Sequence, residues 1–151
     1  MLNLRFWEAL YNPPLMAAFL AMGSSQLFKY LRSLARGQRP HIKRIVEYGG
    51  FPSSHTAFIT ACVVAIGLTE GFQSSTFALG VVAACIFAYD ILRLRMTIAQ
   101  SKVELDRLIE GAGLTRLEKA PQVAAHSLPE VLGGVCWGIV AAFIVCLLSI
   151  G

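Results

Sequence analysis

Four apolar stretches limit what this chain can fold into more than any other feature of its sequence. They cover roughly residues 9–28, 53–69, 71–89 and 131–151. A helix needs about 20 apolar residues to cross a bilayer. Only 15% of the residues are charged, against about 25% in soluble domains. We therefore expect an all-α fold in which residues 1–151 form one integral membrane bundle of about four transmembrane helices.

The distribution of basic residues predicts how this bundle is oriented. Lysines and arginines gather in two connecting segments, 29–48 and 93–127, whereas segment 69–76 carries only Glu70. The positive-inside rule makes the two basic segments cytoplasmic and places both termini outside. A capping-box pattern at Ser101 predicts one or two short amphipathic helices within the second segment. Anionic headgroups are favoured over nucleic acid as the partner of the basic residues.

A serine-rich motif marks the start of the second apolar stretch. Residues 49–55 read GGFPSSH, which places Ser53, Ser54 and His55 where a helix is expected to begin. The first turn of a helix has unpaired N–H groups and a partial positive charge, so it attracts anions. An imidazole can also exchange a proton near neutral pH. The motif therefore indicates a phosphoryl-transfer site at the edge of the membrane.

A second histidine stands close to the start of the last apolar stretch. His126 is followed four residues later by Glu130, a spacing that brings both side chains to one face of a helix. A carboxylate on one imidazole nitrogen fixes the tautomer and leaves the other nitrogen free to attack. The alternative is purely structural, because Ser127 and Glu130 also form a capping-box pattern. The two roles are compatible. The four cysteines show no metal-ligand spacing, so we expect no metal.

These two motifs resemble signatures of the type 2 phosphatidic acid phosphatase superfamily, which also contains the vanadium haloperoxidases. Residues 49–55 look like its second signature. His126-x-x-x-Glu130 looks like its third, with Glu where Asp is usual. The doubled glycine, the small size and the apolar stretches are most similar to the divergent bacterial and plastid branch, often described as acid phosphatase/haloperoxidase-related.

The resemblance implies a metal-independent phosphoric ester hydrolase without a cofactor. His126 would be the nucleophile that forms a phosphohistidine, Glu130 would orient it, and His55 would protonate the leaving alcohol. The groups implied to hold phosphate oxygens are Lys29, Ser53, Ser54 and Arg95, with support from Asp90, Arg93 and Arg39. Positioned cations are what phosphoryl transfer mainly requires.

The sequence also departs from the superfamily in its arginines. No arginine precedes His126 closely, so the third-signature cation would have to be Arg93 or Arg95. Residues 90–96 read DILRLRM, where the branch usually shows Asp-x-x-Gly-Val-Arg-Arg. The first signature, Lys followed by six residues and Arg-Pro, appears only across residues 32–40, or loosely from Lys29.

Together these features predict a membrane lipid phosphatase with its active site facing the cytoplasm. The resemblance implies a phospholipid or polyprenyl phosphate substrate: phosphatidylglycerol phosphate, phosphatidic acid or polyprenyl diphosphate. The membrane would be a bacterial inner membrane or a plastid membrane. The alternative is a non-enzymatic membrane protein that binds anionic headgroups or scaffolds a partner. A homo-oligomer is compatible with either function.

Overall fold

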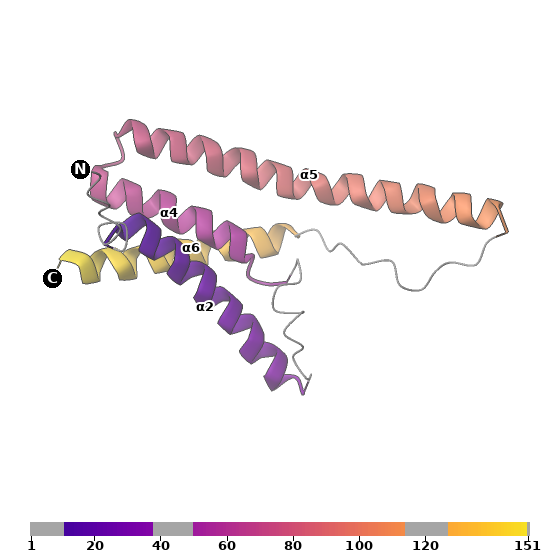
Figure 1. Ribbon diagram of the computed structural model, residues 1–151, viewed down its shortest axis with the longest axis horizontal. Helices are drawn as coiled ribbons and strands as arrows, with labels where there is room; N and C mark the ends of the chain where they lie inside the picture. The colour runs from indigo at the N-terminus through magenta and orange to yellow at the C-terminus, as the bar shows by residue number, and fades with distance from the viewer. Residues whose placement is uncertain (1–10, 38–49, 114–126, 151) are drawn as a thin grey trace, which may run out of the picture.

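The computed structural model describes residues 11–37, 50–113 and 127–150, which fold into the helices of Figure 1. These helices are α2 (Pro13–Ala35), α4 (Ser54–Glu70), α5 (Ser75–Gly111) and α6 (Leu128–Ile150). No strand occurs in the described ranges, so the predicted all-α class is confirmed for them. Within the described part, two helices are long and apolar enough to cross a bilayer, namely α5 over Ser75–Arg93 and α6 over Leu128–Ser149.

Helix α2 begins later and ends later than the predicted span at residues 9–28. Asn12 caps it, because its side-chain oxygen accepts a hydrogen bond from the Leu15 amide at 3.0 Å. Two prolines follow in the first turn, where a missing N–H costs no hydrogen bond. Nothing then breaks the helix until Gly37, which adopts a positive φ of 69°. The prediction that a connecting segment begins at residue 29 was therefore wrong, since Lys29 lies inside α2.

Helix α5 also extends far beyond the predicted span at residues 71–89. It continues for 37 residues, from Ser75 to Gly111, as a single element. The sequence between Gly80 and Gly111 contains neither glycine nor proline, so nothing interrupts the helix. The prediction of a separate short helix starting at Ser101 was therefore wrong, because this capping-box pattern lies inside α5. The rest of the predicted segment, residues 114–126, lies outside the described residues.

Helices α2, α4 and α6 pack into a three-helix bundle with a core of small side chains. The core residues are Ala17, Ala21, Ala57, Ala61, Ala65, Ala141, Ala142, Val145 and Cys146. Small residues let helix backbones approach closely, which is how helices associate within membranes. Gly138 shows how close this approach is, since a Cβ there would lie 2.6 Å from the Ala57 carbonyl oxygen. The bundle thus fixes α4 and α6 against each other.

Helix α5 lies outside this bundle. It packs mainly along α4 and runs well past the end of the other helices (Figure 1). None of its Ser75–Arg93 segment is buried against the rest of the protein. In a bilayer this segment would therefore be covered by lipid or by another protein.

Candidate functional site

The two motifs, far apart in sequence, meet at one end of the bundle. The Ser53 amide donates a hydrogen bond to the Glu130 carbonyl oxygen at 2.9 Å. Gly133 and Gly134 of α6 make this approach possible. A Cβ at Gly134 would lie 2.5 Å from the Ser53 carbonyl oxygen, and one at Gly133 would overlap the Phe51 ring. The N-termini of α4 and α6 therefore lie side by side, and both favour negative charge there.

Ser53 is the N-cap of α4 and is fully buried. Its hydroxyl oxygen accepts a hydrogen bond from the Thr56 hydroxyl at 2.9 Å and a longer one from the Thr56 amide at 3.4 Å. The Ser53 hydroxyl is therefore used to cap α4, and the Ser53 amide is used in the hydrogen bond to the Glu130 carbonyl oxygen. The structure thus explains Ser53 as a helix cap independently of any phosphate.

Ser54 and His55, the next two residues of the motif, differ in solvent exposure. Ser54 is only 1% exposed, and its hydroxyl has no hydrogen-bond partner among the described residues. A buried hydroxyl without a hydrogen-bond partner costs free energy, so such a group usually forms a hydrogen bond with a ligand or an ordered water. His55 is exposed in the first turn of α4, next to Ser54. The motif therefore offers one unsatisfied hydroxyl and one accessible imidazole.

Glu130 closes the start of α6. Its Oε2 accepts a hydrogen bond from the Ser127 amide at 2.7 Å, which is the carboxylate half of a capping box. The structural interpretation of this motif is therefore confirmed for that half. The predicted nucleophile, His126, lies outside the described residues, directly before Ser127 in the chain. Glu130 thus orders the residue that follows His126.

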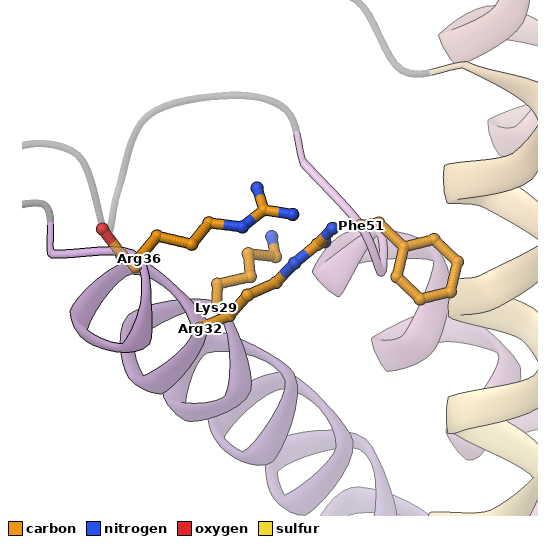
Figure 2. A pocket seen from close by; sticks show the side chains of 5 residues that line it. Lys29, Arg32, Arg36 and Phe51 are labelled. Atoms are coloured by element: carbon orange, nitrogen blue, oxygen red, sulfur yellow. The ribbon is translucent and has the colours of Figure 1, made fainter.

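A cationic pocket lies beside these helix starts. Its lining consists of Lys29, Arg32, Ser33, Arg36 and Phe51, and its volume is about 140 Å³. Figure 2 shows the three basic side chains leaving α2 on the same side and extending toward the turn at Phe51. Each water molecule takes up about 30 Å³ in the liquid, so the pocket has room for a group of phosphate size.

The spacing of these cations on α2 explains why they share one pocket. Positions 29, 32, 33 and 36 follow the helical repeat, so they fall on one face of the helix. Like charges at this spacing repel, and an anion among them would relieve the repulsion. We refer to Lys29, Arg32 and Arg36 as the α2 cation face. Three basic side chains of one helix thus line one pocket.

Lys29 connects this face to the motif helices. It is half-buried, and its aliphatic stem lies 3.9 Å from where a Cβ on Gly50 would be. Burial lowers the pKa of Lys29 from its ordinary value of 10.5, and the negative charge of Glu130 partly opposes this effect. Lys29 therefore lies within electrostatic reach of the carboxylate at the start of α6.

The predicted site residues of α5 whose side chains the structure describes do not line the α2 pocket. Arg93 donates a hydrogen bond to the Tyr89 hydroxyl at 2.9 Å, and its guanidinium lies 5.8 Å from the centre of the same ring. Asp90 is exposed on α5. The backbone of Arg95 is helical, whereas Arg39 lies outside the described residues. Neither Arg93 nor Asp90 lines the α2 pocket.

Sequence reasoning missed Arg36 as a site residue and treated Arg32 only as the start of a degenerate signature. The signal that would have found them is their helical spacing from Lys29. It becomes visible only when α2 is extended through Ala35, which the expected loop at residue 29 concealed. Within the described ranges, no group of three or more His, Cys, Asp or Glu residues could hold a metal ion.

Comparison with known proteins agrees with these motifs. A family model described as "Divergent PAP2 family" matches residues 10–141. The uncharacterized membrane protein YuiD of Bacillus subtilis (strain 168) is 24% identical over 151 residues, covering 91% of this chain and 96% of the relative. No solved structure matches. The relative's description and the two helices long enough to cross a bilayer together indicate membrane association.

Proposed function

Because this chain belongs to the divergent PAP2 family, we propose that it is a membrane phosphatase that hydrolyses a lipid phosphate monoester or diphosphate. The observation that carries the proposal is the convergence of three elements at one end of the bundle. The starts of α4 and α6 meet through the Ser53–Glu130 hydrogen bond, and the α2 cation face lies beside them. Two helix N-termini and three cations form a strongly anion-attracting site.

The reaction would proceed in two steps. A nitrogen of His126 attacks phosphorus while the bond to the leaving oxygen breaks, and His55 gives that oxygen its proton. Water then attacks the phosphohistidine, His55 takes a proton from this water, and phosphate leaves with His126 restored. Glu130 would position the nucleophile, since it already holds the adjacent Ser127 amide. No metal is needed, because the cations neutralise the phosphate charge.

The phosphate would be held mainly by α2 and by the first turn of α4. Lys29, with Arg32 and Arg36, would contact the non-bridging oxygens, and the unpaired Ser54 hydroxyl would donate to one of them. The Ser53 region would contribute the positive end of α4. Arg95 remains a candidate for a further phosphate contact.

The proposed topology has four spans, with α2 and α4 joining α5 and α6 in the bilayer. Both motifs and the α2 cation face would then lie at the cytoplasmic side, and the termini outside. Substrates made on the cytoplasmic leaflet fit this arrangement: phosphatidylglycerol phosphate, phosphatidic acid or a polyprenyl diphosphate. A bacterial inner membrane or a plastid membrane would be the location.

One observation favours a second candidate function, in which the protein binds anionic headgroups without hydrolysing them. The lining of the α2 pocket includes neither of the described catalytic candidates, His55 and Glu130. The pocket could therefore bind a phosphate without chemistry. The two functions differ in whether His126 is required.

Phosphate release from a panel of lipid phosphates by detergent-purified protein tests the proposal. We expect release by the wild type and its loss, by at least about 1,000-fold, in His126→Ala and His55→Ala, because these variants remove the nucleophile and the general acid. His41→Ala is the matched control, since His41 belongs to neither motif, and it should retain activity. Trapping of radiolabelled phosphate on wild-type protein but not on His126→Ala would identify the intermediate.

Absence of phosphate release from every lipid in the panel would overturn the phosphatase proposal. If the wild type then still binds vesicles containing phosphatidic acid, and His126→Ala binds them equally well, headgroup binding without catalysis is the better description.

A further inference from the structure

An apolar groove runs along α4 on the side that faces α5. Its volume is about 240 Å³, and nearly all of its lining is hydrocarbon. Most of the lining comes from α4 and α5, and α6 adds one residue. The residues are Thr56, Ile59, Thr60, Val63, Val64, Val81, Ala84, Cys85, Phe87, Ala88 and Val135. We refer to this feature as the α4–α5 groove.

The groove begins at the serine motif. Its first α4 residue, Thr56, donates its hydroxyl hydrogen bond to Ser53 at 2.9 Å. Thr56 is thus shared between the groove and the N-cap of α4. A molecule whose phosphate lies at the start of α4 would reach the Thr56 end of the groove within one helical turn.

The groove has a definite depth. Between Thr56 and Val64, α4 rises by about 12 Å at 1.5 Å per residue. One leaflet of the hydrocarbon core is about 15 Å deep, half of the roughly 30 Å total. At the far end α4 and α5 approach closely, since a Cβ on Gly80 would lie 3.1 Å from Val63 Cγ2. In the proposed topology the groove would therefore extend from the headgroup level toward the bilayer midplane and narrow there, between Val63 and Gly80.

The groove is also accessible from the bilayer. Because α5 packs mainly against α4 and its Ser75–Arg93 segment is not buried, no other described helix covers this side. Ala84 and Ala88 are small and half-buried, which leaves space between the two helices. A hydrocarbon chain could enter laterally without crossing a polar surface.

We propose that the α4–α5 groove binds a hydrocarbon chain of the lipid whose phosphate occupies the site at the start of α4. This inference rests on the proposed function and narrows its substrate class. The substrate carries at least one long apolar chain, and small water-soluble phosphate esters are poor substrates. Continuity of the groove with the serine motif and its single-leaflet depth select a lipid chain over a helix from a second copy.

Filling the groove tests the proposal. Ala84→Phe and Ala88→Phe place a ring in the groove, whereas Ala83→Phe places the same ring on an exposed position of α5 outside it. We expect kcat/KM for a long-chain lipid phosphate to fall at least about ten-fold more than for its six-carbon analogue in the groove variants. This corresponds to displacing roughly two methylene groups from apolar surroundings. Ala83→Phe should show no such selectivity, and equal losses on both chain lengths in the groove variants would overturn the proposal.

Photocrosslinking provides a readout that does not depend on hydrolysis. Vesicles would contain a phosphatidic acid with a diazirine near the middle of one chain. We expect labelling within residues 56–64 and 81–88, competed by unlabelled phosphatidic acid but not by phosphatidylcholine. Ala84→Phe should suppress this labelling and Ala83→Phe should not.

The crosslinking result separates the two proposals. Specific labelling of the groove in a protein that releases no phosphate would refute the phosphatase and retain the lipid-chain site. Labelling spread evenly over the exposed face of α5, or crosslinks between two copies through the groove, would overturn the lipid-chain site. Unchanged elution of Ala84→Phe and Ala88→Phe on size exclusion would show that they remain folded.

Discussion

The bundle of α2, α4 and α6 differs from α5 in how its helices are held. In the bundle, alanines and glycines bring backbones into contact, and one hydrogen bond, from the Ser53 amide to the Glu130 carbonyl oxygen, joins the starts of α4 and α6. Helix α5 has one main neighbour and exposes large side chains such as Leu79, Val82 and Ile86. The closely packed part of the protein would therefore position the proposed phosphate site, whereas the contact between α4 and α5 would leave room for the proposed lipid chain.

Two glycines show the contrast at the level of single atoms. A Cβ on Gly138 would press on the Ala57 carbonyl oxygen at 2.6 Å, and a carbonyl fixed in a helix cannot move aside. A Cβ on Gly80 would meet only the Val63 side chain, at 3.1 Å. Alanine at Gly138 would thus overlap backbone atoms, whereas alanine at Gly80 would require only the Val63 side chain to shift by a few tenths of an ångström.

The largest effect on activity is expected from removing a basic side chain from α2, compared with removing one from α5. Arg32→Ala should lower kcat by about 100-fold or more, because it removes a positioned charge from the phosphate. Arg93→Ala, on α5, should have a much smaller effect, since the Arg93 guanidinium is engaged with Tyr89. Steady-state hydrolysis of the lipid substrate measures both. Equal losses would place the phosphate between α2 and α5 rather than on α2.

Next in size is the effect of a methyl group at the two glycines. Gly138→Ala should destabilise the protein by about 1–3 kcal/mol through overpacking. Gly80→Ala should be neutral or stabilising by up to about 1 kcal/mol, because alanine is the better helix former and Val63 can adjust. Unfolding in mixed detergent micelles measures this difference. Similar stabilities of the two variants would show that α4 and α6 are held no more tightly than α4 and α5.

A pH effect should sharpen the role of Lys29. Its pKa is lowered by burial, so the unfolded state binds a proton more readily than the folded state between that lowered pKa and 10.5. Stability should therefore rise with pH in this window. Phosphate affinity should fall over the same window, because Lys29 loses its charge. Vanadate inhibition measured from neutral to alkaline pH follows this change.

Lys29→Arg is the control for that measurement. Arginine keeps its charge throughout the window, so the fall in affinity should shift to higher pH or disappear. An identical pH profile in this variant would exclude Lys29 as the titrating group.

The smallest effect concerns two aromatic hydrogen bonds. Within the bundle, Trp137 Nε1 donates to the Ser24 hydroxyl at 2.8 Å, and the Trp137 ring packs on Phe28. Trp137→Phe should cost about 0.6 kcal/mol or slightly more, the typical value of a hydrogen bond between membrane helices. Tyr89→Phe removes only an exposed bond within α5 and should cost less. Detergent unfolding compares them, and a larger cost for Tyr89→Phe would contradict the comparison.

The sequence predicted helix class and the position of the α4 start well, because Ser53 carries a strong local signal that the structure uses as a cap. The prediction failed where a local capping signal lies within a stretch that can continue as one helix. Ser101 has the same kind of pattern, but it lies in a run without glycine or proline, and the helix continues through it. Local capping energies are about 1 kcal/mol, too small to end a helix that can propagate.

For the site, the sequence identified the two motifs and Lys29, but not Arg32 and Arg36, which line the same pocket. The departures in residues 90–96 directed attention to Arg93 or Arg95, and the α2 cation face supplies charge from another helix. Proximity between helices cannot be read from spacing along one chain.

The bond between the Ser53 amide and the Glu130 carbonyl consists only of main-chain atoms. Main-chain atoms are the same in every amino acid except proline, so the donor and acceptor of this bond do not depend on which side chains stand at the two positions. The junction instead depends on its neighbour Gly134, where any side chain would collide with the Ser53 carbonyl oxygen.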